Sequence, residues 1–512
     1  MSNNMGNNSE SRISGGEMLR SRQAGVIMPV FSLPSKYGIG NLGKEAYAFV
    51  DFLAAAGQKL WQVLPLNPTG FGDSPYASCS VFAGNPYFID LDALIEAGLL
   101  KKSEVNAVDF GKDKNRIDYE KLYLGRGNLL KKAFKRANKE DDGFIEFTVK
   151  NAEWLDDYAL FMALKTHFSM KPWQAWEDAG ARLHRQSVLK KYGSKLQTEI
   201  EFHKYLQYLF YSQWEKVKTY ANSRGIGIIG DMPIYCALDS VDCWANINKF
   251  QLDKDGRPKL VAGVPPDAFN EDGQLWGNPL YDWKRMKRDG YAWWMRRLEQ
   301  AADMFDIIRI DHFRALEGYW AVPAEAGSAE YGHWENGPGL DFVLAIKKRF
   351  PGCGFIAEDL GYLTESVHEL RRASGFLGMK VLEFAFDPSG KSDYLPHKYD
   401  KDCVCYTGTH DNDPLGVHLG NISKEERAFI KNYLGTSASG AGALTTAMLR
   451  AGLASTASVF VSQMQDWLKA DASSRINTPG TSENNWQWRV NKSALSGRLA
   501  SKMRALTELY GR

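Results

Sequence analysis

The sequence predicts a closed (β/α)8 barrel of the TIM type, with subdomains inserted between some of its strands. Eight short segments rich in β-branched and other apolar residues have the length of buried parallel strands. Segments with helical periodicity alternate with several of them, and two long stretches without a core strand interrupt the series. A chain of 512 residues can hold such a barrel and its insertions as one unit.

The first two predicted strands and the helix between them form the unit of a parallel sheet. The apolar segment 24–30 is followed by an amphipathic helix at 45–56 and by a second apolar segment at 59–66. The connecting loop at 38–43 is rich in glycine. It lacks the G-x-G-x-x-G spacing and a Walker lysine, which disfavours a phosphate-binding loop.

Two insertions are expected between later strands. The third strand follows only at 225–231, so an inserted subdomain is predicted at about 66–200. It opens with a turn-rich loop and continues with helical patterns at 154–165 and 199–223. A second insertion is predicted at about 232–300, where adjacent prolines stiffen a loop. The remaining strands are predicted at 306–310, 354–357, 379–384, 403–406 and 457–461.

The composition narrows the class of protein. The formal net charge is only +2, which provides no electrostatic footprint for nucleic acid or an anionic membrane. The chain contains 15 Trp and 23 Tyr, whose rings suit stacking on sugars, although most tryptophans in any protein serve packing.

Cysteine usage and the N-terminal residues favour a cytoplasmic protein. The six cysteines form no C-x-x-C pair and no group with zinc spacing, so we interpret them as reduced thiols. Residues 1–21 are polar and lack an apolar h-region, which predicts a disordered leader followed by a single catalytic barrel at 22–512. No apolar run reaches the ~18 residues that a membrane span needs.

Polar side chains follow four of the predicted strands at their C-terminal ends. Asp231 ends the third strand, Asp311 the fourth and Glu358 the fifth, while His410 and Asp411 follow the seventh. One such acid alone would be interpreted as a cap or an ion-pair partner. Because the chemistry of a (β/α)8 barrel lies at this face, four of them together indicate an active site.

Arg309 interrupts the fourth strand two residues before Asp311. Period-2 alternation places both on one side of the strand, about 7 Å apart, where a structural ion pair is the simpler interpretation. Convergent carboxylates are compatible with two kinds of site, one that binds a hard metal ion and one that catalyses glycosyl transfer. A nearby guanidinium favours glycosyl transfer, because it benefits a nucleophilic carboxylate and not a metal ligand. Glycosyl transfer with retention of configuration requires two carboxyls about 5 Å apart, and neighbouring strands lie about 4.8 Å apart. Asp311 and Glu358 therefore suit the roles of nucleophile and general acid/base.

Six motifs in order resemble those of one enzyme family. They are GDSPY at 72–76, GVPPD at 263–267, RIDHFR at 309–314, AEDLG at 357–361, GTHDND at 408–413 and the segment PGT to NW at 479–486. The likeness extends over about 25–499 and is to the 4-α-glucanotransferases called amylomaltase or disproportionating enzyme, glycoside hydrolase family 77. It implies a barrel related to the α-amylases, with inserted subdomains and no separate C-terminal β-domain.

The resemblance also implies roles for individual residues. It makes Asp311 the nucleophile, Glu358 the general acid/base and Asp411 a third carboxylate that binds sugar hydroxyls. The residues implied to bind substrate are Tyr76, Asp73, Ser74, Asp231, Asp267, Gln274, Trp276, Arg309, His410 and Asn485. Two positions depart from the family pattern, since Ala315 stands where Gly is common and Pro414 where Thr is common. Neither change removes a catalytic group.

The expected function is a 4-α-glucanotransferase of starch, glycogen or maltooligosaccharide metabolism. It would move α-1,4-glucan segments to the 4-hydroxyl of an acceptor by retaining double displacement, with no cofactor, metal, nucleic acid or membrane partner. Three alternatives stay open: an α-glucan hydrolase on the same barrel, a catalytically inactive glucan-binding protein, and a metal-dependent barrel enzyme.

Overall fold

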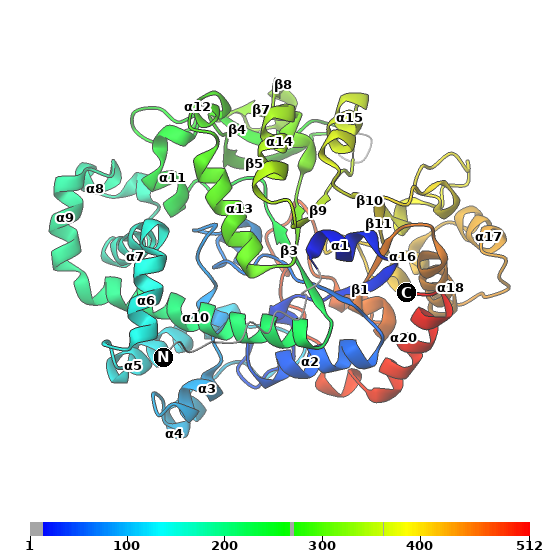
Figure 1. Ribbon diagram of the computed structural model, residues 1–512, viewed down its shortest axis with the longest axis horizontal. Helices are drawn as coiled ribbons and strands as arrows, with labels where there is room; N and C mark the ends of the chain where they lie inside the picture. Colours follow the sequence, from blue (N-terminus) through cyan, green and yellow to red (C-terminus); the bar gives the residue numbers. More distant parts are fainter. Residues whose placement is uncertain (1–13, 267–270, 362) are drawn as a thin grey trace, which may run out of the picture.

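Eight parallel strands form the central sheet of the computed structural model, which describes residues 14–266, 271–361 and 363–512 (Figure 1). Neighbouring strands pair in parallel throughout, and a single parallel bridge between Ile356 and Leu377 joins the two ends of the series. The strands are β1 (Gln23–Ile27), β2 (Leu60–Gln62), β3 (Gly227–Met232), β6 (Ile307–Ile310), β9 (Gly354–Ala357), β10 (Gly378–Val381), β11 (Cys403–Tyr406) and β12 (Val459–Gln463). Each overlaps a predicted strand, and the predicted barrel is confirmed.

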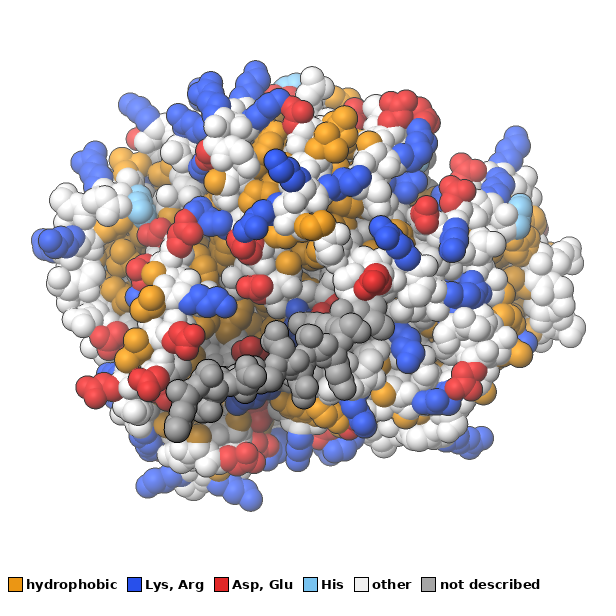
Figure 2. Space-filling view, in the orientation of Figure 1, with side chains coloured by type: hydrophobic (Ala, Val, Ile, Leu, Met, Phe, Trp, Pro, Cys, Tyr) orange, Lys and Arg blue, Asp and Glu red, His pale blue; other side chains and the backbone are white. Residues whose placement is uncertain are grey.

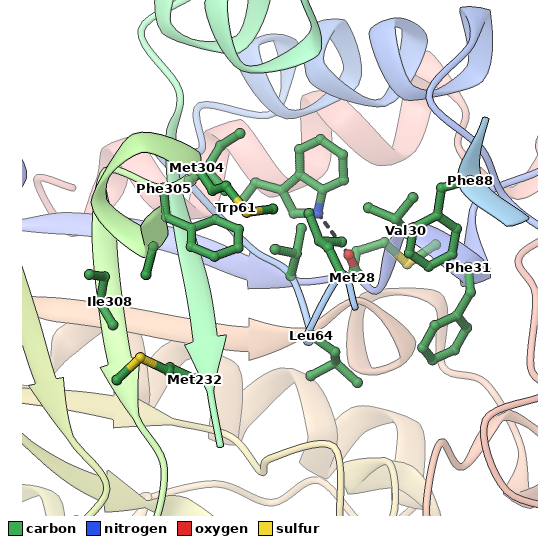
Figure 3. Packing of buried hydrophobic residues seen from close by; sticks show 14 of the residues in the cluster. Met28, Val30, Phe31, Trp61, Leu64, Phe88, Met232, Met304, Phe305 and Ile308 are labelled. Carbon is green, nitrogen blue, oxygen red and sulfur yellow. Dashed lines mark hydrogen bonds between the residues drawn. The ribbon is translucent and has the colours of Figure 1, made fainter. Parts of the chain in front are cut away.

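The strands are apolar on both faces because helices cover the outside and other strands close the inside. In β6, Ile307 belongs to a cluster inside the ring, whereas Ile308 packs outward against the helices. Figure 3 shows part of the outer layer, where the indole of Trp61 donates a hydrogen bond of 2.7 Å to the carbonyl of Met28. This alternation determines which residues face the barrel interior.

Helices that follow or precede the strands surround the sheet (Figure 1). They include α2 (Lys44–Ala55), α10 (Gln197–Ser223), α13 (Ala292–Met304), α14 (Gly339–Arg349), α15 (Glu365–Ser374), α16 (Leu415–Asn421), α17 (Lys424–Tyr433), α18 (Ala441–Ala454), α19 (Met464–Leu468) and α20 (Gly497–Leu509). The helices predicted at 45–56 and 199–223 correspond to α2 and α10. No helix in the described residues is both long and apolar enough to cross a bilayer.

Further helices occupy the chain between β2 and α10 and between β3 and α13. The first group contains α3 (Leu91–Glu96), α4 (Lys102–Asn106), α5 (Tyr119–Arg136), α6 (Asp142–Lys150), α7 (Ala152–His167), α8 (Ala179–Arg182) and α9 (Gln186–Lys195). The second contains α11 (Val241–Ala245) and α12 (Trp283–Arg288). The helix predicted at 154–165 lies within α7. The division into insertions at about 66–200 and 232–300 stays a prediction.

A second, antiparallel sheet was not predicted. Its strands are β4 (Leu260–Val264), β5 (Gln274–Pro279), β7 (Gly318–Pro323) and β8 (His333–Asn336), in the order β5-β4-β7-β8. Two of them come from the chain between β3 and α13, and two from the chain after β6. The sheet thereby joins segments on either side of the fourth barrel strand.

The disorder predicted for residues 1–21 does not extend over α1 (Gly15–Arg20), and residues 1–13 lie outside the described part of the chain. Ser14 and Glu17 form a capping box at the start of this helix. Leu19 is buried in the cluster inside the ring, against residues of several strands. Contacts with the barrel therefore hold a polar segment whose composition alone favours disorder.

Gly15 is required for this contact. A β-carbon at Gly15 would lie 1.8 Å from the carbonyl oxygen of Asp306, whereas at Gly16 the nearest atom would be 3.6 Å away. We expect Gly15→Ala to destabilise the protein by about 1–3 kcal/mol because α1 must move off the barrel. The midpoint of thermal unfolding measures this, with Gly16→Ala as the matched control. A midpoint for Gly15→Ala equal to that of the control would contradict the packing described.

Candidate active site

Four of the predicted residues face the barrel interior at the C-terminal ends of three neighbouring strands. Ile229, Ile307 and Ile356 point into the ring, and alternation by two turns Asp231, Arg309, Asp311 and Glu358 to the same side. Ile310 pairs with Ala357, so Asp311 and Glu358 occupy the next position of the same register. The two proposed catalytic carboxyls thus emerge side by side from β6 and β9.

Arg309 holds two of the carboxylates. One of its terminal nitrogens, Nη1, donates to both oxygens of Asp231, at 2.7 and 2.8 Å, and to Oδ1 of Asp311 at 2.8 Å. Arg309 and Asp231 are each only 3% exposed, whereas the side chain of Asp311 is 27% exposed. Burial lowers the pKa of Arg309, but the surrounding carboxylates dominate and raise it well above its usual value. The guanidinium therefore stays charged and fixes Asp311 at the rim.

Glu358 is held in a different electrostatic state. Its carboxylate accepts hydrogen bonds from the backbone N–H of His312, at 2.7 Å, and of Leu360, at 3.1 Å. Burial and the nearby charge of Asp311 raise the pKa of Glu358 to about 8, against the opposing effects of Arg309 and the two backbone donors. His312 adopts a left-handed backbone conformation, with φ of 49°, where its N–H reaches Glu358. Near neutral pH, Glu358 is mostly protonated beside an arginine-paired Asp311.

Asp411 is held by hydrogen bonds from Arg475 and Asn477, two residues that were not predicted to contribute to the site. The side-chain amide of Asn477 donates to Oδ1 of Asp411 at 2.6 Å, and Arg475 donates to the Asp411 carbonyl at 2.7 Å. Arg475 also pairs with Asp413 at 2.9 Å. Arg475 and Asn477 lie two to four residues before the PGT motif at 479–481, and this proximity was the signal of their position in the sequence. The side chain of Asp411 stays 41% exposed and free to meet a ligand.

Tyr76 brings its loop to the same mouth. Its hydroxyl donates to Oδ2 of Asp231 at 2.8 Å, and its ring stacks on His410 with centroids 4.9 Å apart. Burial and the nearby acids raise the pKa of Tyr76 well above its usual value, so the hydroxyl remains a donor. Trp486, which ends the last of the six motifs but was assigned no role, packs against both rings at 5.7 and 5.8 Å.

The remaining predicted residues are less tightly connected to these carboxyls. The ring of Trp276, on β5, meets the His312 ring edge to face at 4.8 Å, and Gln274 accepts a hydrogen bond from its indole. Ser74 caps the turn that carries Tyr76. Burial raises the pKa of Asp73.

Asn485 and Asp267 complete the set of predicted residues. Asn485 is 6% exposed and hydrogen bonds to Thr478 and Thr481, so it braces the loop that contains the PGT motif. Asp267 lies outside the described residues. Within the described ranges, no three or more His, Cys, Asp or Glu side chains converge in a way that suits a metal ion.

The barrel and its mouth define a class of enzyme. Paired carboxyls on adjacent strands, one held by an arginine and the other protonated near neutral pH, are the arrangement with which enzymes cleave glycosidic bonds with retention. The comparisons with known proteins identify the family within this class.

Residues 28–495 match the family model described as 4-alpha-glucanotransferase. The 4-alpha-glucanotransferase of Streptococcus pneumoniae serotype 4 is 44% identical, covering 96% of this chain and 98% of its own. That of Thermus thermophilus is 43% identical, over 95% and 98% of the two chains. The structure of amylomaltase from Streptococcus agalactiae in complex with acarbose superposes with a TM-score of 0.93 at 40% identity, over 96% and 99%. The chain therefore belongs to the 4-alpha-glucanotransferases, glycoside hydrolase family 77, and is a transferase of that family.

Proposed function

We propose that the chain transfers α-1,4-glucan segments from a donor to the 4-hydroxyl of an acceptor glucan or glucose by double displacement. The observation that carries this proposal is the placement of an arginine-paired Asp311 next to a Glu358 whose pKa is raised to about 8. One carboxyl is thus ready to attack, and the other is ready to donate a proton.

In the first step, the Asp311 carboxylate attacks C1 of a glucose unit in the donor. The bond from C1 to the departing 4-oxygen breaks, and Glu358 passes its proton to that oxygen. A covalent β-glucosyl ester on Asp311 results, with Glu358 now ionised. As the ester forms, Arg309 loses one charge partner but keeps Asp231, so the guanidinium remains paired throughout.

In the second step, Glu358 takes the proton from the 4-hydroxyl of an acceptor. The acceptor oxygen attacks C1, the ester bond to Asp311 breaks and the α configuration returns. Asp411, aimed by Asn477, would accept hydrogen bonds from sugar hydroxyls. The Tyr76 and His410 stack offers an aromatic face to the same glucose.

The outer residues extend this proposal to the glucan chain. We place Trp276, Gln274, Asp73 and Ser74 along the bound segment, because an aromatic platform and planar polar groups suit pyranose rings. Asn485 acts on substrate through the loop that it braces. The same assignment is proposed for Asp267.

We also infer that the enzyme works in the cytoplasm. All six cysteines are unpaired thiols, and four of them are buried, which suits a reducing compartment.

The products formed from maltotriose test the transfer reaction. We expect glucose together with a ladder of longer maltooligosaccharides, without added cofactor. Formation of glucose and maltose alone would instead establish the hydrolase alternative. Loss of activity in the presence of EDTA would favour the metal-dependent alternative.

The pH dependence tests the role of Glu358. Because Glu358 must be protonated to act as the acid, kcat/KM should fall on the basic side near pH 8, the pKa of its carboxyl in the free enzyme. Initial rates on maltotriose between pH 5 and pH 10 measure this limb, with thermal unfolding at each pH as a control for folding. A flat profile up to pH 9.5 would exclude Glu358 as the acid.

A further inference from the structure

A groove of about 600 Å³ lies on the outside of the barrel, separate from the catalytic mouth. Its walls are the inserted helix α7, the barrel helices α10 and α13, and the short helix α11. Figure 1 shows these helices meeting on one face of the molecule, and Figure 2 shows apolar side chains gathered there among acidic and basic ones. None of the residues assigned to the active site lines this groove.

Aromatic rings from different elements line the groove. Trp154 lies nearly parallel to Phe82, with centroids 6.2 Å apart and planes at 15°, and it also contacts the Tyr211 ring at 5.9 Å. Trp293 meets Phe82 edge to face at 6.1 Å. Phe82 and Trp293 are buried, while Trp154 and Tyr211 are partly exposed. The floor is therefore rigid, and an indole is available at the wall.

Polar groups are interleaved with these rings. The Trp154 indole donates to the side-chain oxygen of Asn151 at 3.1 Å, which fixes the orientation of the ring. An ion pair between Glu153 and Arg296 joins α7 to α13 across the groove. Asn246 and Gln300 also line the groove. Aromatic faces flanked by amides and carboxylates are suited to the C–H faces and hydroxyl pairs of a sugar chain.

The charges of the lining argue against an anionic ligand. The groove has three basic side chains, Lys150, Lys218 and Arg296. The acidic side chains that line it are more numerous: Glu153, Asp157, Glu215, Glu299 and Asp303, together with Asp242, whose pKa burial raises to about 7. A phosphate, nucleotide or nucleic acid would be repelled by this excess, whereas a neutral polyol would not.

The groove is separate from the catalytic site but close to it. Gln300 and Met304 line the groove and also a smaller cavity, which extends inward to Tyr76 and Asp231. A glucan held outside this layer would be anchored next to the barrel without occupying the mouth. A second point of attachment raises the effective concentration of a long substrate at the first.

We propose that this groove is a second binding site for a maltooligosaccharide segment of α-1,4-glucan. The ligand class rests on the proposed function, and the site itself rests on the aromatic and polar lining of the groove. The site would strengthen the binding of long glucans and would have no effect on the binding of a substrate as short as maltotriose.

Equilibrium dialysis with labelled maltoheptaose counts the sites. Asp311→Asn stops turnover without emptying either site, so we expect two molecules bound per chain at saturation. In Asp311→Asn with Trp154→Ala, the number should fall to one. Ala245→Arg, which adds a long charged side chain to the groove from a partly exposed position on α11, should have the same effect. Tyr510→Ala, another partly exposed ring at the far end of the chain, is the matched control and should retain two.

Kinetics on the otherwise unchanged enzyme provide the second readout. Trp154→Ala and Ala245→Arg should each raise KM for amylose about 3- to 10-fold and leave kcat/KM for maltotriose within about 2-fold. One molecule bound per Asp311→Asn chain, or two bound after both groove variants, would overturn the second site while leaving the proposed function intact. Turnover by Asp311→Asn would overturn the proposed mechanism, whatever the number bound.

Discussion

Asp311→Asn lowers the turnover of maltotriose by at least about 10⁴-fold while the fold and glucan binding remain. Removal of a nucleophile that forms a covalent intermediate typically costs this much or more, because the remaining groups have no bond to make at C1. The amide fills the same volume as the carboxylate, and Arg309 keeps its two hydrogen bonds to Asp231. Single-turnover assays with maltotriose measure the loss.

Asp359→Asn is the matched control for this experiment. Asp359 directly follows Glu358, but alternation turns it outward, where it pairs with Arg371 at 3.0 Å. We therefore expect its activity to stay within a few-fold of the unchanged enzyme. Residual activity above about 1% in Asp311→Asn would remove Asp311 from the role of nucleophile.

The barrel strands could be predicted because strands buried on both faces appear in the sequence as short apolar segments. Segments such as Ile307–Ile310 are short and dominated by β-branched residues, with only Arg309 interrupting this one, and the ring holds them in register. The antiparallel sheet was missed for the opposite reason. Its strand β8 is largely exposed, and its partner β7 packs with strands from a distant part of the chain. Such pairing is decided by tertiary contacts and not by local preference.

The same distinction applies to the site. Asp231, Asp311 and Glu358 follow strand ends, so the barrel rule alone places them at one face. Asn477 and Arg475 come from an irregular segment whose path depends on the groups it meets, and no periodicity in the sequence reveals their contact with Asp411.

We propose both a structural and a catalytic role for Arg309. An isolated Arg-x-Asp pair is most simply an ion pair within a strand. The structure gives Arg309 a second carboxylate, Asp231, which is almost completely buried and also accepts a hydrogen bond from the hydroxyl of Tyr76. The guanidinium thus neutralises a buried acid and at the same time orients Asp311, so its removal should affect stability as well as activity.

Arg309→Met should therefore lower the free energy of unfolding by about 3–5 kcal/mol near pH 8, in addition to a large loss of activity. Burial already raises the pKa of Asp231, with Arg309 opposing it, so loss of the guanidinium raises that pKa further. A carboxyl whose pKa is higher in the folded than in the unfolded protein takes up a proton on folding. The destabilisation is therefore largest above the folded pKa and becomes smaller as the pH falls.

Urea denaturation at pH 8 and at pH 5, followed by tryptophan fluorescence, measures this difference. Arg297→Met is the matched control, because Arg297 is equally buried but donates to the backbone carbonyls of Pro233 and Ile234 and not to a carboxylate. The charge of Arg297 also lowers the pKa of the buried Asp242, so its loss should cost somewhat more at pH 8 than at pH 5. The difference should be smaller than for Arg309→Met, because Arg297 donates to backbone carbonyls whereas Arg309 contacts Asp231 directly. If Arg309→Met were no more destabilising at pH 8 than at pH 5, relative to the unchanged protein, Asp231 would not depend on Arg309 for its charge. The ion pair would then be a consequence of the fold, and the orientation of Asp311 would require another source.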